Sequence, residues 1–309
     1  MYTYFEENGN DYAVNTLTGE VLDAIKTIVP VGSRIITPEQ QEAYKKRKEI
    51  ERLKAQRIEQ DSDLGYFYFL RKDHETGKIS ADTLGRLIYL LTYLDYDGNL
   101  MLSQRKPMKK SDLENVMGLS RSTVWRFWQE INGRYIVETD GVLKLSNNDV
   151  IRGKLCTDGH VYQKFYINAI RKLYRRIKKT SRHKYLGYVY MTLPYINLEF
   201  NIICHNPDET NLKAVKPMSI GEFCNKIGYD AGNFDRLRKI YSQITFDVDE
   251  EEQYFLSFVM NNYDANSIRM FVNPRILYSG SNYKDVEMLG VFCKKTKQKQ
   301  TDEKNIPML

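Results

Sequence analysis

The expected fold depends first on the stretch Pro107-Met-Lys-Lys-Ser-Asp-Leu-Glu-Asn-Val-Met-Gly118-Leu-Ser-Arg-Ser-Thr-Val-Trp-Arg-Phe-Trp-Gln-Glu-Ile131. Ser111, followed three residues later by Glu114, has the pattern of a capping box, which opens a short helix. Gly118 can end that helix with a positive φ, and Ser120 can cap a second helix after the turn. Two short helices joined by a glycine turn form a helix-turn-helix unit, whose second helix lies in the major groove of DNA.

The two faces of this helix pair differ in composition. The positions that must point inward are all apolar: Leu113, Met117, Leu119, Val124 and Phe127. The outward positions are Ser120, Arg121, Ser122, Trp125, Arg126 and Gln129. Arg and Gln bond bidentately to guanine and adenine edges, and Ser can bond to phosphate or base. We therefore interpret the outward set as DNA-binding residues; the alternative is an ordinary helical hairpin with a solvated face.

The residues on either side extend the pattern. Tyr135–Leu145 is typical of two short strands turned at Asp140-Gly141, which is a strong hairpin signal. The apolar run from Asp82 to Leu94 predicts another helix before the pair. Three helices and a hairpin make the winged-helix plan, so we expect a first winged-helix DNA-binding module over residues 79–155.

A second copy of the pattern follows. Lys216-Pro-Met-Ser-Ile-Gly-Glu-Phe-Cys-Asn-Lys-Ile-Gly228 lies over Lys106–Gly118 at a constant offset of 110 (216 minus 106). Upstream, Leu186-Gly187 lies over Leu84-Gly85 at an offset of 102 (186 minus 84), so the second copy carries eight extra residues (110 minus 102). Apolar positions kept in phase through three helices predict a second winged-helix module over residues 185–293.

The second copy differs where it would touch DNA. Its outward set is Asp230, Ala231, Gly232, Asp235, Arg236 and Lys239. Arg236 and Lys239 are its candidate DNA contacts. Its hairpin is expected over Ile244–Val248 and Tyr254–Met260, joined by the acidic turn Asp249–Glu252, which suits a phosphate backbone poorly. The first copy is thus expected to be the main reader, and the second either a weaker reader or a protein-contact module.

A basic helix is expected between the copies, over Gln163–Lys184. Its candidate phosphate contacts are Arg175, Arg176, Lys178 and Lys179. A run of like charge is usually a solvated face. This run has few acidic residues near it and lies between two candidate readers, which favours phosphate contact.

The remaining regions complete the expected organisation. Residues 1–36 are typical of a small β-hairpin, and Glu39–Gln60 of a charged helix, either a connecting arm or a weak coiled coil. The expected regions are 1–78, the hairpin and helical arm; 79–155, the first module; 156–184, the basic linker helix; 185–293, the second module; and 294–309, a disordered tail. The expected fold class is mainly α with small β: two tandem winged helix-turn-helix modules plus an N-terminal β-hairpin and helical arm.

Composition limits the functional classes. The chain has 309 residues, a net charge of +6, four scattered cysteines and four histidines. No Cys-x-x-Cys or His/Cys ligand pair indicates a metal site, and the cysteine spacing fits a reducing cytoplasm rather than a disulfide framework. No long apolar run or signal sequence occurs, so we expect no membrane association. Nucleotide-binding and nucleophile-elbow motifs are also absent, so neither an enzyme nor a cofactor is expected.

The chain resembles winged-helix replication and regulatory proteins of phages and plasmids of low-GC Gram-positive bacteria. The resemblance depends on the first copy, on the Lys-Pro-Met tripeptide that precedes each helical pair, and on the closing segment Phe271-Val-Asn-Pro-Arg-Ile-Leu-Tyr278. The RepL-like plasmid initiators, themselves similar to MarR-type regulators, belong to this group. The resemblance covers roughly residues 80–150 and 185–280. It implies binding of double-stranded DNA at repeated sites, to open an origin or to control transcription. Glu114, Asp235 and the acidic second turn depart from it and put base reading by the second copy in doubt.

Three functions stay open at this point. The first is a sequence-specific double-stranded DNA-binding protein of a phage or plasmid, acting as transcription regulator or replication initiator in the bacterial cytoplasm. The second is a DNA-bound scaffold that recruits RNA polymerase or replisome proteins through the second copy. The third is an enzyme such as a nickase, for which the sequence offers no site. A homodimer is left open.

Overall fold

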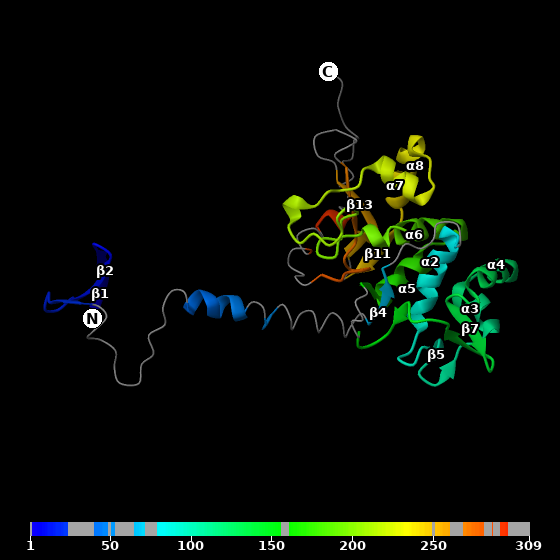
Figure 1. Ribbon diagram of the computed structural model, residues 1–309, viewed down its shortest axis with the longest axis horizontal. Coiled ribbons are helices and arrows are strands. Elements are labelled where there is room, and N and C mark those ends of the chain that lie inside the picture. The colour runs from blue at the N-terminus through cyan, green and yellow to red at the C-terminus, as the bar shows by residue number, and fades with distance from the viewer. Residues whose placement is uncertain are drawn as a thin grey trace, which may run out of the picture. The chain divides into compact units, whose positions relative to one another are not determined.

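Figure 1 shows the computed structural model of the chain, which describes residues 2–23, 40–48, 51–52, 65–71, 79–155, 161–248, 251–259, 268–280, 286 and 291–295. The chain divides into two compact units, Met1–Lys54 and Ala55–Leu309. Residues 65–71, which were expected in the N-terminal region, therefore lie in the second unit.

The first unit holds an antiparallel sheet of three strands, β1 (Tyr2–Glu7), β2 (Asn10–Asn15) and β3 (Val21–Asp23). Asn8 and Gly9 both have positive φ and form the two-residue turn between β1 and β2, as an Asn-Gly pair favours. This sheet has one strand more than the expected hairpin. Residues 40–48 and 51–52 are helical, and the rest of the helix expected over Glu39–Gln60 lies outside the described residues.

The second unit contains strands and helices in alternation. Its first part has β4 (Tyr66–Leu70), α2 (Ala81–Leu90), η1 (Leu91–Tyr93), β5 (Met101–Ser103), β6 (Lys106–Pro107), η2 (Lys110–Asp112), α3 (Leu113–Met117), α4 (Arg121–Ile131), β7 (Ile136–Thr139), β8 (Val142–Leu145) and β9 (Val150–Ile151). Its second part has β10 (Tyr162–Tyr166), α5 (Ile167–Arg176), η3 (Thr180–Arg182), α6 (His183–Tyr190), η4 (Leu193–Tyr195), η5 (Leu212–Ala214), α7 (Ile220–Ile227), η6 (Ala231–Asn233), α8 (Phe234–Tyr241), β11 (Thr245–Val248), β12 (Glu251–Tyr254), β13 (Leu256–Val259), β14 (Arg269–Val272) and η8 (Val291–Cys293).

The expected fold class, mainly α with two tandem winged helix-turn-helix modules, is wrong. The structure is a mixed α/β fold, 40% helical and 28% strand, and the strands of the described residues lie in six small sheets. The strands are short, and the three-stranded sheet of the second unit joins segments far apart in the chain. Because hydrophobic periodicity reports only local structure, it does not reveal pairings of this kind.

The three-stranded sheet of the second unit has the order β10-β4-β9 and ties the two parts together. Phe165 on β10 stands opposite Phe67 on β4, and the two buried rings stack with their centroids 5.4 Å apart. Residues of both parts contribute to one continuous apolar core. The sequence analysis assigned β4 to the N-terminal region, but this pairing makes it a central strand of the second unit.

Helices α2 and α6 pack closely against each other beside this sheet (Figure 1). A Cβ atom at Gly85 would lie 2.6 Å from the carbonyl oxygen of His183, and a Cβ atom at Gly187 would overlap the carbonyl oxygen of Ala81. Only glycine at these two positions lets the two backbones approach so closely. The contact therefore fixes how the two parts of the unit are joined.

The first helical pair, which consists of η2, α3 and α4, was largely predicted correctly. Gly118 ends α3 with a φ of 62°. All five residues expected to point inward are buried, namely Leu113, Met117, Leu119, Val124 and Phe127. The hairpin of β7 and β8 follows, turned at Asp140 and Gly141 with φ values of 53° and 73°.

The capping box predicted for the start of this pair is wrong. Ser111 and Glu114 form no capping box; the backbone N–H of Lys109 instead donates to the Asp112 carboxylate at 2.8 Å. The first turn is a 3-10 turn that begins at Lys110. Its N-cap residue is therefore Lys109, and the carboxylate three residues later is that of Asp112. Ser120 stands at the N-cap position of α4, as expected, although its side chain makes no capping hydrogen bond.

The second helical pair, which consists of α7, η6 and α8, follows the first at the offset of 110. Helix α7 covers 220–227, as η2 and α3 together cover 110–117, and η6 with α8 covers 231–241, as α4 covers 121–131. Gly228 ends α7 with a φ of 67°, and Ser219 forms a capping box with Glu222. The two helical pairs thus agree residue for residue in the extent of their helices.

Two further expectations in this part are wrong. The hairpin expected to return over Tyr254–Met260 does so earlier, since β12 pairs with β11 while β13 pairs with β14. The basic helix expected over Gln163–Lys184 is divided into strand β10, helix α5 and the 3-10 turn η3. Pairing of β10 with the distant strand β4 overrides the local helical pattern. Most of the tail expected over 294–309 lies outside the described residues.

Candidate nucleic-acid interface

Helix α4 presents one polar face to solvent. Its apolar residues Val124, Phe127, Trp128 and Ile131 are buried, which fixes the rotation of the helix. The six residues predicted to point outward are all exposed: Ser120, Arg121, Ser122, Trp125, Arg126 and Gln129. Trp125 is 61% exposed, an unusual exposure for so large an apolar ring. The structure therefore gathers the whole predicted set on one accessible helix face.

The two arginines of this face keep their charges available. Within the described residues, no carboxylate lies within ion-pair distance of Arg121 or Arg126. Arg126 only reaches back along its own helix, where its Nε lies 3.5 Å from the carbonyl oxygen of Ser122. An unpaired guanidinium on an exposed helix can donate two parallel hydrogen bonds to a guanine edge or to a phosphate.

The segment before α4 adds positive charge that the sequence analysis did not assign to the site. Lys109 and Lys110 are exposed at the start of the first helical pair. Lys110 Nζ lies 4.8 Å from the ring centroid of Trp128, so its position is held by a cation–π contact. Two adjacent lysines at the start of the helical pair were the available signal.

The β7–β8 hairpin has the opposite character. Its exposed tip carries Glu138, Thr139 and Asp140. Two carboxylates at the tip are unfavourable beside a phosphate backbone. The hairpin tip is therefore less suited to contact a nucleic acid than α4 and the basic residues near it.

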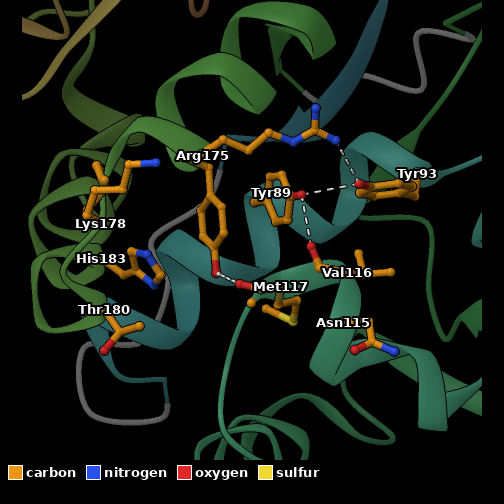
Figure 2. A pocket seen from close by; sticks show the side chains of 12 residues that line it. Tyr89, Tyr93, Asn115, Val116, Met117, Arg175, Lys178, Thr180 and His183 are labelled. Atoms are coloured by element: carbon orange, nitrogen blue, oxygen red, sulfur yellow. Dashed lines mark hydrogen bonds between the residues drawn. The ribbon is translucent and has the colours of Figure 1, made fainter.

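The turn at Gly118 is held from behind by tyrosines of α2 and α5 (Figure 2). Tyr89 donates its hydroxyl to the carbonyl oxygen of Val116 at 3.0 Å, and Tyr174 donates to that of Met117 at 3.3 Å. The last carbonyl groups of a helix have no partner within the helix, so these bonds satisfy the end of α3. The rings of Tyr89 and Tyr174 stack at 3.8 Å. The position of the turn, and hence of α4, is set by this rigid support.

A hollow of about 450 Å³ opens between the Gly118 turn and the segment that follows α5 (Figure 2). Arg175 Nη2 lies 3.5 Å from the Tyr93 hydroxyl, which lies 3.2 Å from that of Tyr89. Burial, followed by the hydrogen bond with Tyr93, raises the pKa of Tyr89 to about 12, so this phenol stays protonated. Lys178 and Thr180 also line the hollow. The basic segment therefore lies directly beside the turn that leads into α4.

The basic segment at the end of α5 and after it carries the four predicted phosphate contacts, Arg175, Arg176, Lys178 and Lys179. These four residues are not equivalent. Arg175, Lys178 and Lys179 are exposed, and no carboxylate of the described residues pairs with them. Arg176 instead bonds to Asp247 at 2.6 Å and to Glu252 at 2.7 Å. Since its charge is already compensated by two carboxylates, Arg176 is the member of the set least available to a phosphate.

Helix α8 of the second pair exposes two cations without an acidic partner among the described residues. Arg236 and Lys239 are exposed on α8, whereas Arg238 pairs with Asp235 at 3.2 Å. Asp230 caps the start of η6 by accepting from the backbone N–H of Gly232 at 2.9 Å, as its expected role as N-cap requires. The predicted residues Arg236 and Lys239 therefore lie together on one accessible face, as Arg126 and Gln129 do on α4.

The described residues contain no group of three or more His, Cys, Asp or Glu side chains that could hold a metal ion. Within that same part of the chain, no helix is both long and apolar enough to cross a membrane. Comparison of the chain with known protein families, with characterised proteins and with solved structures finds no match.

Proposed function

We propose that the chain is a sequence-specific double-stranded DNA-binding protein of a phage or plasmid, acting as transcription regulator or replication initiator in the bacterial cytoplasm. The observation that supports this is the exposed face of α4, on which Arg121, Arg126 and Gln129 stand together without acidic partners among the described residues. The helix follows a glycine turn and is held rigidly at its back. In this geometry an exposed helix can enter the major groove and present its side chains to base edges.

Phosphate contacts would come from the basic residues around this helix. Lys109 and Lys110 precede it, and Arg175, Lys178 and Lys179 lie beside the Gly118 turn. Such contacts fix the position of a protein on the duplex without reading its sequence. The division assigns specificity to α4 and much of the affinity to the flanking charges.

Selection of bound duplexes from a random DNA pool tests the proposal. The wild-type chain should enrich a defined sequence motif that contains guanine, because arginine prefers that base. The variant Arg126→Ala should enrich the same motif with one position relaxed, whereas Lys154→Ala, which removes an exposed lysine after β9, should leave it unchanged. If the wild-type chain enriches no motif, base reading by α4 is excluded.

A further inference from the structure

The two parts of the second unit make reciprocal contacts. Gly85 on α2 meets the carbonyl oxygen of His183, and Gly187 on α6 meets that of Ala81. Both glycines and both carbonyl groups correspond at the same offset of 102 (187 minus 85 and 183 minus 81). When residue A of one copy touches residue B of the other, and B of the first touches A of the second, the copies are related by a two-fold axis.

The central sheet has the same reciprocity. Strands β4 and β10 pair antiparallel, with Phe67 opposite Phe165, so a local two-fold axis relates them. Each strand is flanked on its other side by the segment that closes its own half: β4 by β9, and β10 by Leu277. Helices and sheet therefore indicate one approximate two-fold axis through the unit.

The first helical pair follows α2 in the chain and the second follows α6, so the two pairs occupy corresponding places in the two halves. The α3–α4 pair and the α7–α8 pair lie apart from each other in Figure 1, with α2 and α6 between them. The basic segment after α5 adjoins both: it lines one hollow with Asn115–Gly118 and another with Gln243–Thr245, which directly follow α8. A duplex that contacts this segment is accordingly placed next to both pairs.

We infer that a single chain reads a bipartite DNA site whose two half-sites run in opposite directions and differ in sequence. This inference rests on the proposed function and extends it to α8. Symmetric dimers bind palindromic sites because both reading helices are identical. Here both helices belong to one chain, so the two-fold arrangement is present while the exposed residues are free to differ.

Comparison of the exposed positions shows what the half-sites share. At the offset of 110, Arg121 corresponds to Ala231, Ser122 to Gly232, Trp125 to Asp235, Arg126 to Arg236 and Gln129 to Lys239. Arg126 and Arg236 form the one identical pair of this set, and both are exposed without an acidic partner among the described residues. The half-sites should therefore share a guanine at the position that faces these arginines and differ around it.

The test combines selection from a random DNA pool with the mass of the resulting complex in solution. Wild-type chain should enrich two blocks in opposite orientation, each with one guanine at the corresponding place, and should bind as one chain per duplex. Arg121→Ala should relax only the first block, and Lys239→Ala only the second. Arg126→Ala and Arg236→Ala should each relax the guanine of their own block, with a loss of affinity of about tenfold to a hundredfold.

The outcomes separate this inference from the function on which it rests. A motif of one block that is insensitive to Arg236→Ala and Lys239→Ala overturns the inference and leaves base reading by α4 intact. A palindrome bound by two chains overturns it as well. If the wild-type chain enriches no motif at all, the proposed function itself fails. Thermal unfolding of each variant should match that of the wild type, because all four side chains are exposed.

Discussion

His183 is buried at the contact between α2 and α6, where a neutral imidazole is required. Arg86 on α2 donates from its Nε to Nδ1 of His183 at 3.4 Å, and this nitrogen can accept only while it carries no proton. The Tyr174 ring of α5 covers the imidazole at a centroid distance of 4.4 Å. Burial, followed by the charge of Arg86, lowers the pKa of His183 to about 4, although Asp82 and the backbone of Ile177 act in the opposite direction.

The first prediction concerns the effect of pH on stability. Because the folded-state pKa of His183 lies below its unfolded value of about 6.5, unfolding takes up a proton as the pH falls. Above pH 6.5 the neutral imidazole of His183 should make its full contribution to the free energy of unfolding. Between pH 6.5 and pH 4 the free energy of unfolding should fall by about 3 kcal/mol.

Urea unfolding at pH 7.5, 5.5 and 4.5 checks this, with His183→Asn as the comparison because Asn keeps an oxygen acceptor for Arg86. As the pH falls, the free energy of unfolding of the wild type should decrease more than that of His183→Asn. If both proteins lose stability in parallel, the protonation of His183 is not the cause.

At the scale of elements, sequence reasoning succeeded where structure is local. The spacing of Val124, Phe127 and Ile131 sets which face of α4 is buried, and Gly118 with Asp140-Gly141 marks the two turns. It failed for β10, because this strand exists through its pairing with β4, far earlier in the chain. The capping box at Ser111 failed for another reason: the first turn begins earlier, where the Asp112 carboxylate accepts from the backbone N–H of Lys109.

A second prediction tests the contact between α2 and α6. Gly187→Ala places a methyl group against the backbone of Ala81, and backbone cannot yield as a flexible side chain does. We expect a loss of about 2–3 kcal/mol in unfolding free energy. Gly221→Ala is the matched control, since this helical glycine of α7 has open space around it and alanine there should stabilise the protein by up to about 1 kcal/mol.

Urea denaturation of both variants measures the difference. Equal stability of Gly187→Ala and Gly221→Ala would mean that the two helices can separate without cost. That result would also remove the reciprocal contact from which the two-fold arrangement was inferred.

At the scale of the whole molecule, the expected fold class was wrong although many of its helices were right. The sequence repeat at offset 110 predicted the positions of η2, α3, α7, α4 and α8, but it contained no information on the sheet β10-β4-β9. That sheet, together with Gly85 and Gly187, joins the two parts around one core. Two separate modules were expected because each copy was considered alone.

In the proposed function, DNA binding is divided between two surfaces of the second unit. The exposed face of α4 would read bases, and the basic segment with Lys178 and Lys179 would contact phosphates. Removing a phosphate contact should weaken binding to all sequences alike and flatten the slope of log affinity against log salt by about 0.9 per contact. Removing a base contact should weaken binding to the cognate sequence alone.

The most direct test of base reading by α4 is the affinity of Arg126→Ala for the selected duplex and for a scrambled duplex, measured by fluorescence anisotropy over a series of salt concentrations. Lys178→Ala, which also removes one positive charge, is the control. We predict that Arg126→Ala weakens binding to the selected duplex by about tenfold to a hundredfold and to the scrambled duplex much less. Lys178→Ala should weaken both alike with a flatter salt slope. Equal losses on both duplexes for Arg126→Ala would contradict base reading by α4.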